Sequence, residues 1–188
     1  MAATRAARGR PAARKLDRDA VISVAMTLLE QRGEDFSMRE IARWLAVDAM
    51  AIYHYFPSKG ELLKALAVRQ LEDFSRAADA IPRALDANGR LDAVCEAYLA
   101  IIRPRPNLVR LVAQGLVGDA GLAQRFAQVF DGCLEGRGLD EAGRALARDT
   151  VVDFLHGHAL AGDAPQVRPW TDGVAAIVAG AARAPARR

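Results

Sequence analysis

Aromatic residues and cysteines are scarce in this chain of 188 residues, and long apolar runs are missing. Aromatic side chains make up 6% of the sequence, which does not favour a β protein, because strands are enriched in them. Two cysteines, Cys95 and Cys133, cannot form a disulfide framework, and we expect both to be small core residues. No apolar run approaches the roughly 20 residues of a membrane-spanning helix, and the N-terminus lacks the apolar segment of a secretory signal. The sequence therefore predicts a cytoplasmic protein with no membrane partner.

Positive charge is concentrated at the N-terminus. The formal net charge is +3, but residues 1–18 hold six basic residues against one acidic residue, and the remainder is close to neutral. Such a run is typical of an arm that contacts a polyanion, either nucleic acid or an acidic membrane surface. A solvated tail has the same composition. We expect residues 1–15 to form a flexible basic arm.

Helical periodicity runs through the rest of the chain, and no strand pattern is visible. Asp17 can cap a helix over about 17–32, and the capping boxes Ser37…Glu40 and Ser58…Glu61 predict helix starts at residues 38 and 59. The remaining helices are predicted at about 38–45, 49–55, 59–80, 90–102, 106–117, 122–136, 140–161 and 170–183. The fold class predicted from this pattern is all-α.

Two short helices separated by three residues, behind one longer helix, form a helix-turn-helix pattern. Its small core is expected to contain the following residues of the three helices and the turn: Val24, Leu28, Ile41, Leu45, Val47 and Ile52. A short second helix fits the major groove of B-DNA, where base edges can be read. Residues 16–60 are therefore predicted to be a DNA-binding domain.

A longer motif strengthens this prediction. The stretch from Phe36 to Leu63 contains Ile-Tyr-His-Tyr-Phe at 52–56, then Ser58-Lys59 and Glu-Leu-Leu at 61–63. It resembles the signature of the TetR (tetracycline-repressor-like) family of bacterial transcriptional regulators. The resemblance implies an N-terminal helix-turn-helix head, joined by a long helix to a C-terminal helical bundle for ligand binding and dimerisation over residues 61–188.

The resemblance also implies DNA contacts at particular positions. They are Arg39 at a base edge, Ala49, Met50 and Ala51 at the base-facing start of the recognition helix, Tyr53, Tyr55 and Lys59 at phosphates, and Ser37 at the backbone. The three residues at 49–51 offer no side-chain hydrogen bonds, so we expect them to read thymine methyl groups or shape. Arg39 is then the main candidate for guanine.

The turn departs from the family pattern. The family usually has glycine where this chain has Ala46. A left-handed residue other than glycine costs roughly 1 kcal/mol, so the turn is expected to be strained or slightly reshaped.

The C-terminal two thirds carry weaker signals. The resemblance implies an effector cavity among these helices, and Tyr98, Phe126, Phe130 and His156 are its candidate lining, although the same residues could fill a solid core. Small residues recur in 140–161 and 170–183, and in the family two such helices from each subunit form a four-helix dimer interface. A two-fold dimer also doubles the number of base pairs that are read.

Two other classes of function have some support in the sequence. Asp149, Asp153 and His156 share one helix face and could form a metal site or the polar centre of a small enzyme, with His158 nearby. The two histidines, however, lie about 200° apart around a helix and do not converge. A membrane or adaptor module is disfavoured because the arm lacks bulky apolar residues. We therefore predict no enzyme, cofactor or metal, but a repressor that binds a palindromic double-stranded DNA operator as a homodimer and is released by a small, mostly apolar effector.

Overall fold

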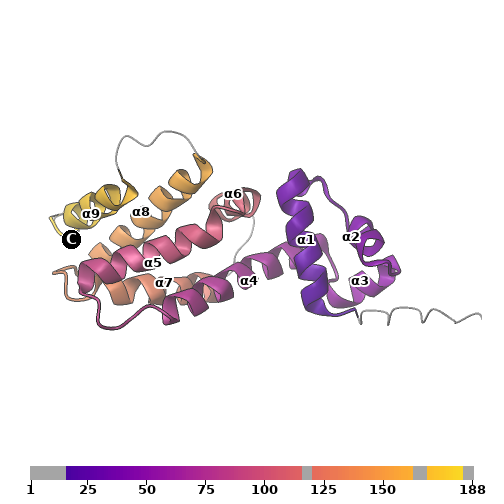
Figure 1. Ribbon diagram of the computed structural model, residues 1–188, viewed down its shortest axis with the longest axis horizontal. Helices are drawn as coiled ribbons and strands as arrows, with labels where there is room; N and C mark the ends of the chain where they lie inside the picture. Colours follow the sequence, from indigo (N-terminus) through magenta and orange to yellow (C-terminus); the bar gives the residue numbers. More distant parts are fainter. Residues whose placement is uncertain (1–15, 116–119, 163–168, 184–188) are drawn as a thin grey trace, which may run out of the picture.

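The computed structural model describes residues 16–115, 120–162 and 169–183, and within these ranges the chain is helical without strands (Figure 1). The predicted all-α class is confirmed. The helices are α1 (Arg18–Arg32), α2 (Met38–Leu45), α3 (Ala49–Tyr55), α4 (Lys59–Asp79), α5 (Ala87–Ile102), α6 (Pro106–Ala113), α7 (Ala120–Leu134), α8 (Glu141–Leu160) and α9 (Trp170–Ala181), with one 3-10 turn, η1 (Gly33–Asp35). The predicted arm at 1–15 lies outside the described residues.

Helices α1, α2 and α3 form a small head at one end of the molecule (Figure 1). Its helices begin where the capping signals predict: Asp17 accepts a hydrogen bond from the Ala20 amide, and Ser37 and Glu40 form a reciprocal capping box. The predicted core is confirmed. Ile41 and Ile52 are fully buried with Leu28, and Val24, Leu45 and Val47 pack around them.

Helix α4 connects the head to the body formed by α5–α9 (Figure 1). Its first turns, from Leu62 to Ala67, belong to the apolar core of the head, whereas Leu71, Phe74 and Ala78 belong to the core of the body. The head core therefore takes in nearly two turns of α4 beyond the predicted domain boundary at residue 60. One continuous helix shared by two cores makes the orientation of the head depend on the packing of the body.

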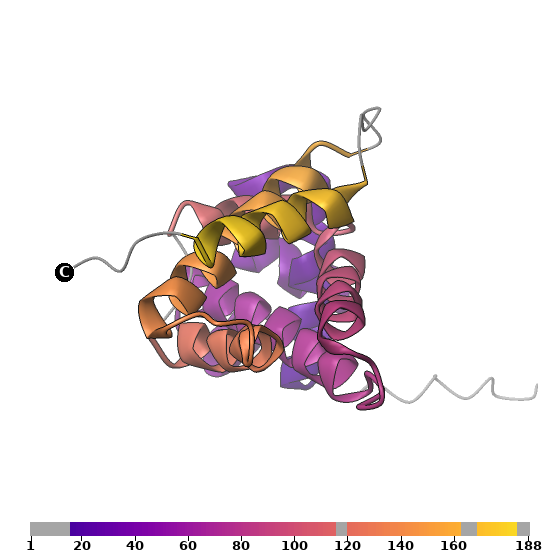
Figure 2. The same cartoon turned by 90° about the vertical axis from the view of Figure 1, so that its left-hand side faces the viewer.

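The body ends in a close pair of helices, α8 and α9, on the side away from the head (Figures 1 and 2). The two helices approach closely at Gly173 of α9, where an added Cβ would lie 2.4 Å from the ring of Phe154 on α8. A side chain at this position would force the Phe154 ring to move. Small residues thus serve close helix packing within the monomer at this point.

The turn between α2 and α3 keeps its shape without glycine. Ala46 adopts the left-handed conformation, with φ 54° and ψ 43°. The Val47 amide donates to the Ala42 carbonyl at 3.0 Å, and the Ala46 amide donates to the Arg43 carbonyl at 3.2 Å. This pair of hydrogen bonds is a Schellman motif, which satisfies the last carbonyls of α2. Ala46 thus takes the left-handed conformation that glycine usually fills, and the turn is not visibly reshaped.

Candidate nucleic-acid interface

A groove lies on the outer side of the head, between α2 and the start of α3. It has a volume of about 410 Å³ and is lined by Ser37, Arg39, Ala42, Arg43, Val47, Asp48 and Ala49. Arg39 is exposed, and no hydrogen bond or ion pair holds its guanidinium within the described residues. The groove therefore presents a free cation beside the first turn of α3.

The exposed side of the first turn of α3 carries no polar side chain. Met50 is 72% exposed and Tyr53 is 40% exposed, whereas Ala49 and Ala51 are half-buried and Ala49 packs on the head core. Of the three residues predicted to open the recognition helix, Met50 is thus the one that projects. Its thioether and methyl group suit an apolar contact such as a thymine methyl.

Tyr55 is placed differently from Tyr53. The Tyr55 hydroxyl donates to the backbone carbonyl of Leu16 at 2.8 Å, and its ring packs against the head core. A phenol has one hydrogen to donate, so this bond leaves none for a phosphate oxygen. Tyr55 fixes the entry into α1, while the hydroxyl of Tyr53 remains on the surface.

Lys59 also has a role within the head. Its ammonium group donates to the backbone carbonyl of Glu34 in η1 and stands 4.7 Å from the ring centroid of Phe36. A lysine has three N–H donors, so two remain for another acceptor. Lys59 therefore ties the start of α4 to η1 and still presents positive charge there.

Ser37 and Glu40 organise the start of α2. The Ser37 hydroxyl accepts from the Glu40 amide, and the Ser37 amide donates to the Glu40 carboxylate at 2.8 Å. The hydrogen bond from the Ser37 backbone holds the pKa of Glu40 below its usual value, assisted by the guanidinium groups of Arg32 and Arg43. The carboxylate is therefore charged at neutral pH and positions this turn, and Ser37 remains exposed beside the groove.

Two exposed side chains in this region were not among the predicted contacts. Arg43 is one turn after Arg39 on the same helix face and lines the same groove. His54 is exposed on α3, with its ring edge-on to Tyr55 at 5.7 Å between centroids. The i, i+4 spacing of the two arginines was the signal that could have identified Arg43.

The head is joined to the body by mutual capping of α1 and α6. Helix α6 has no side-chain cap from its own N-cap residue. Instead, the carboxylate of Glu30 accepts hydrogen bonds from the amides of Asn107 and Leu108 at 3.1 and 3.2 Å. The Asn107 side chain in turn donates to the carbonyls of Leu29 and Glu30 at 2.9 and 3.2 Å. The end of α1 and the start of α6 thus satisfy each other's unpaired backbone groups.

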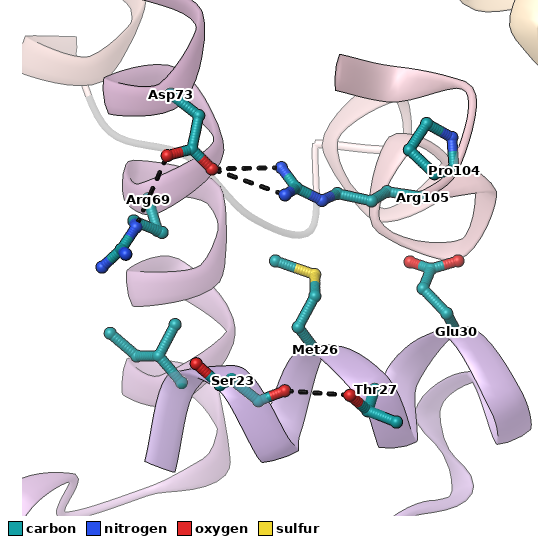
Figure 3. A pocket seen from close by; sticks show the side chains of 9 residues that line it. Ser23, Met26, Thr27, Glu30, Arg69, Asp73, Pro104 and Arg105 are labelled. Atoms are coloured by element: carbon teal, nitrogen blue, oxygen red, sulfur yellow. Dashed lines mark hydrogen bonds and ion pairs between the residues drawn. The ribbon is translucent and has the colours of Figure 1, made fainter. Parts of the chain in front are cut away.

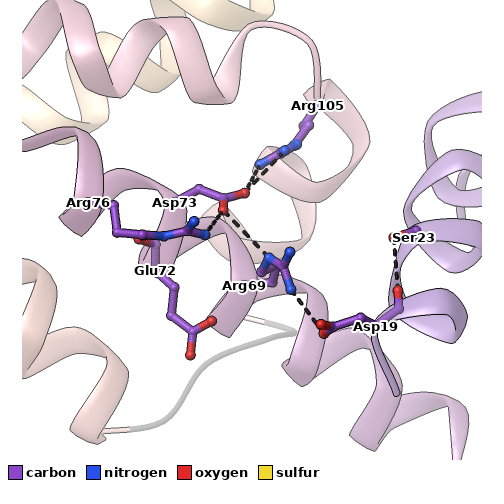
Figure 4. A network of polar contacts seen from close by, with 7 residues as sticks. All are labelled: Asp19, Ser23, Arg69, Glu72, Asp73, Arg76 and Arg105. Atoms are coloured by element: carbon purple, nitrogen blue, oxygen red, sulfur yellow. Dashed lines mark hydrogen bonds and ion pairs between the residues drawn. The ribbon is translucent and has the colours of Figure 1, made fainter. Parts of the chain in front are cut away.

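A chain of charged residues adds a second connection (Figure 4). Arg69 of α4 pairs with Asp19 of α1 at 3.0 Å and with Asp73 at 3.5 Å, and Asp73 also faces Arg105 at 3.4 Å. Arg69, Asp73 and Arg105 also border a groove of about 390 Å³ between α1, α4 and the start of α6, which Glu30 lines as well (Figure 3). Three helices from head and body meet at this junction.

The four residues predicted to line an effector cavity come together in the body. Tyr98, Phe126 and Phe130 have ring centroids 5.1 to 5.9 Å apart, and Phe74 joins them. The Tyr98 hydroxyl lies 2.6 Å from His156 Nε2. Burial raises the pKa of Tyr98 and lowers that of His156, so both are neutral and form one polar pair within an aromatic cluster.

The alternative metal site does not assemble. No group of three histidine, cysteine or acidic side chains within the described ranges is arranged to hold a metal ion. Asp149 pairs with Arg148 at 2.9 Å on the surface, whereas His156 is buried against Tyr98. Across the same ranges, no helix has the length and apolar character needed to cross a membrane.

Comparison with known proteins identifies the head and the fold. Residues 21–66 match the family described as bacterial regulatory proteins, tetR family. Crystal structures of BioQ, one of the Mycobacterium smegmatis protein and one with a double-stranded DNA operator, match with a TM-score of 0.67 and 25% identity, covering 89% of this chain and 98% and 99% of theirs.

Two further relatives agree. A possible TetR family transcriptional regulator from Streptomyces coelicolor is 26% identical with a TM-score of 0.64, covering 88% of this chain and 89% of that one. The nucleoid occlusion factor SlmA of Pasteurella multocida is 27% identical over 160 residues, which span 75% of this chain and 79% of SlmA. The motif in the head and the fold of the whole chain thus lead to one conclusion: residues 21–66 carry the helix-turn-helix head of the tetR family of bacterial regulatory proteins, and the chain shares the fold of TetR-family transcriptional regulators.

Proposed function

We propose that this regulator is a cytoplasmic repressor, without enzymatic activity, that binds a palindromic operator as a homodimer and is released by a small effector. The observation that carries the proposal is the exposed surface of α2 and α3, where Arg39 lines a groove at the start of the recognition helix and Met50 and Tyr53 are exposed on that helix. BioQ, a protein of the same fold, was crystallised with its operator.

Base recognition is assigned to Arg39 and Met50. A guanidinium group can donate two hydrogen bonds to guanine, and the methionine side chain can cover a thymine methyl. Tyr53, Lys59 and Ser37 are assigned to the DNA backbone. Tyr55 is assigned to the head core rather than to phosphate, because its hydroxyl is bonded to Leu16.

Dimerisation is assigned to the outer face of α8 and α9. Leu146, Thr150, Asp153, Gly157 and Leu160 recur at spacings of four and three residues along α8, and all of them are exposed. Leu146 is 54% and Leu160 37% exposed. On α9 the small residues Ala175, Ala176, Ala179 and Gly180 are exposed as well. This spacing is the pattern of a helix seam that packs on another helix pair.

Effector release is assigned to the junction of α1, α4 and α6. Since Glu30 and Asn107 cap the two helices mutually, a shift of α6 must either move the head or break four hydrogen bonds. An effector that fits a shifted α6 better would lower operator affinity by its differential affinity for the two arrangements.

Operator selection tests the DNA-binding proposal. The purified protein is incubated with a random DNA pool, and the selected site is then measured against all single-base variants. We expect a palindrome with half-sites about one helical turn apart. In Arg39→Ala, discrimination at one base pair of each half-site should fall by about 1–3 kcal/mol, while the surface variant Arg83→Ala should match the parent protein. Equal weakening at every base position would show that Arg39 contacts only the backbone.

Molar mass in solution tests the dimer. Leu146→Glu places a charge on the proposed seam and should convert the dimer to monomer, with loss of operator binding. Leu85→Glu is the matched control, because Leu85 is 41% exposed but lies in the α4–α5 connection. A parent protein that is monomeric at micromolar concentration, or a dimeric Leu146→Glu variant, would contradict the assignment.

A further inference from the structure

One buried polar group in the body is left without a partner. Gln70 of α4 is 8% exposed. Among the described residues, its side-chain carbonyl oxygen, Oε1, is the one buried side-chain polar atom that has no hydrogen-bond partner. Buried side-chain amides in folded proteins are nearly always hydrogen-bonded to protein, water or ligand. The Gln70 carbonyl oxygen therefore needs a hydrogen-bond donor that the described residues do not provide.

Gln70 lies where the two apolar cores meet. The residues of α4 that pack in the head core end at Ala67, and those that pack in the body core begin at Leu71. Side chains on a helix lean toward its N-terminus, so the amide lies over the turn that contains Leu66 and Ala67. The buried neighbours of Gln70 on α4, Leu66, Ala67 and Leu71, are apolar and have no side-chain donor to offer Oε1.

The aromatic cluster of the body begins one turn further along the same face of α4. Phe74, four residues after Gln70, packs on Tyr98, Phe126 and Phe130 with centroids 5.0, 5.5 and 5.7 Å away. The charged neighbours Arg69 and Asp73 are held in ion pairs with each other and with Asp19, Arg76 and Arg105. A single unpaired acceptor beside aromatic rings suits a ligand that has an aromatic ring and one hydrogen-bond donor.

We propose that Gln70 is the polar recognition group of the effector site, and that the effector is an uncharged, mainly apolar aromatic molecule whose N–H or O–H group donates to Gln70 Oε1. This inference rests on the proposed function. It adds the chemistry of the effector, and it places the effector beside α4, where the head core and the body core meet. A ligand there would separate α4 from its neighbours near the junction that Glu30 and Asn107 hold closed.

Three probes of one shape test the donor requirement. Indole carries an N–H donor, indene has no polar group, and benzofuran has only an acceptor. Dissociation constants are measured for the full chain by ligand-observed NMR. We expect the parent protein to bind indole about tenfold or more tightly than indene or benzofuran, since a donor satisfies an otherwise unpaired buried group. In Gln70→Leu this preference should disappear.

Thermal unfolding provides the second measurement. Without ligand, Gln70→Leu should melt about 2–10 °C above the parent protein, because it removes a buried unpaired oxygen. Gln70→Met has an unbranched side chain of similar length and should raise the melting temperature in the same way. It replaces Gln70→Leu if that variant does not fold. Equal binding of the three probes, no binding of indole, an indole preference that survives Gln70→Leu, or a lower melting temperature of both variants would overturn the proposal.

Operator binding is measured separately in the same samples. Loss of operator affinity on adding indole, absent in Gln70→Leu, supports both the site and its role in release. Indole that binds through Gln70 without changing operator affinity supports the site and refutes effector release through it. Failure of the parent protein to select any operator refutes the proposed function and leaves the binding result to decide the site.

Discussion

The strained turn of the head gives a prediction with a definite sign. Ala46 is the one residue other than glycine with positive φ in the described ranges, and it closes the Schellman motif of α2. The left-handed conformation costs an L-residue about 1–2 kcal/mol. Glycine removes this cost but loses about 0.5–1 kcal/mol more conformational entropy on folding. We therefore expect Ala46→Gly to stabilise the head by about 0.5–1 kcal/mol.

The two tryptophans allow the head to be followed on its own. Trp44 lies on α2, two residues before Ala46 and 58% exposed, and Trp170 starts α9. Urea unfolding is monitored by Trp44 fluorescence in a Trp170→Phe background. Ala46→Gly should raise the midpoint urea concentration by about 0.25–0.5 M, because the free energy of unfolding falls by about 2 kcal/mol per molar urea. This dependence on urea should not change.

A second alanine in the head provides the control. Ala51 lies in α3 with ordinary helical geometry, so Ala51→Gly makes the same chemical change without relieving strain. It should lower the free energy of unfolding by up to about 1 kcal/mol. If Ala46→Gly is neutral or destabilising while Ala51→Gly behaves as expected, the turn is not held in the left-handed conformation and the reasoning fails.

Two further predictions concern the body and its junction with the head. Glu30→Gln weakens the cap of α6, so the two α6 amides bonded to Glu30 should exchange with solvent about 5–30-fold faster. This corresponds to a loss of about 1–2 kcal/mol. The control variant Glu34→Gln, on the exposed η1 turn, should leave the exchange of these amides unchanged. Burial lowers the pKa of His156, so the unfolded chain binds the proton more readily and stability should fall as pH drops below about 6.5, by at most about 1.4 kcal/mol per pH unit. His156→Gln should flatten this part of the stability profile measured by circular dichroism, and an unchanged profile would contradict it.

Local signals in the sequence were sufficient for the helices and for the outline of the head. Capping residues such as Ser37 and Asp48 act on amides two or three residues away, so the starts of α2 and α3 could be predicted from neighbouring residues alone. The apolar spacing of Ile41 and Ile52 identified the faces that the head buries. The motif around Tyr53 also identified the family, because it is continuous along the chain.

Contacts between distant residues could not be predicted in this way. Tyr53 and Tyr55 look alike in the sequence, yet only packing against α1 directs the Tyr55 hydroxyl to Leu16. The cap that Glu30 provides for α6 joins residues 77 positions apart, and no local rule pairs them. Gln70 reads as an ordinary polar residue of a long helix. Only the meeting of two apolar cores around α4 buries its amide without a partner, because burial depends on which helices pack there.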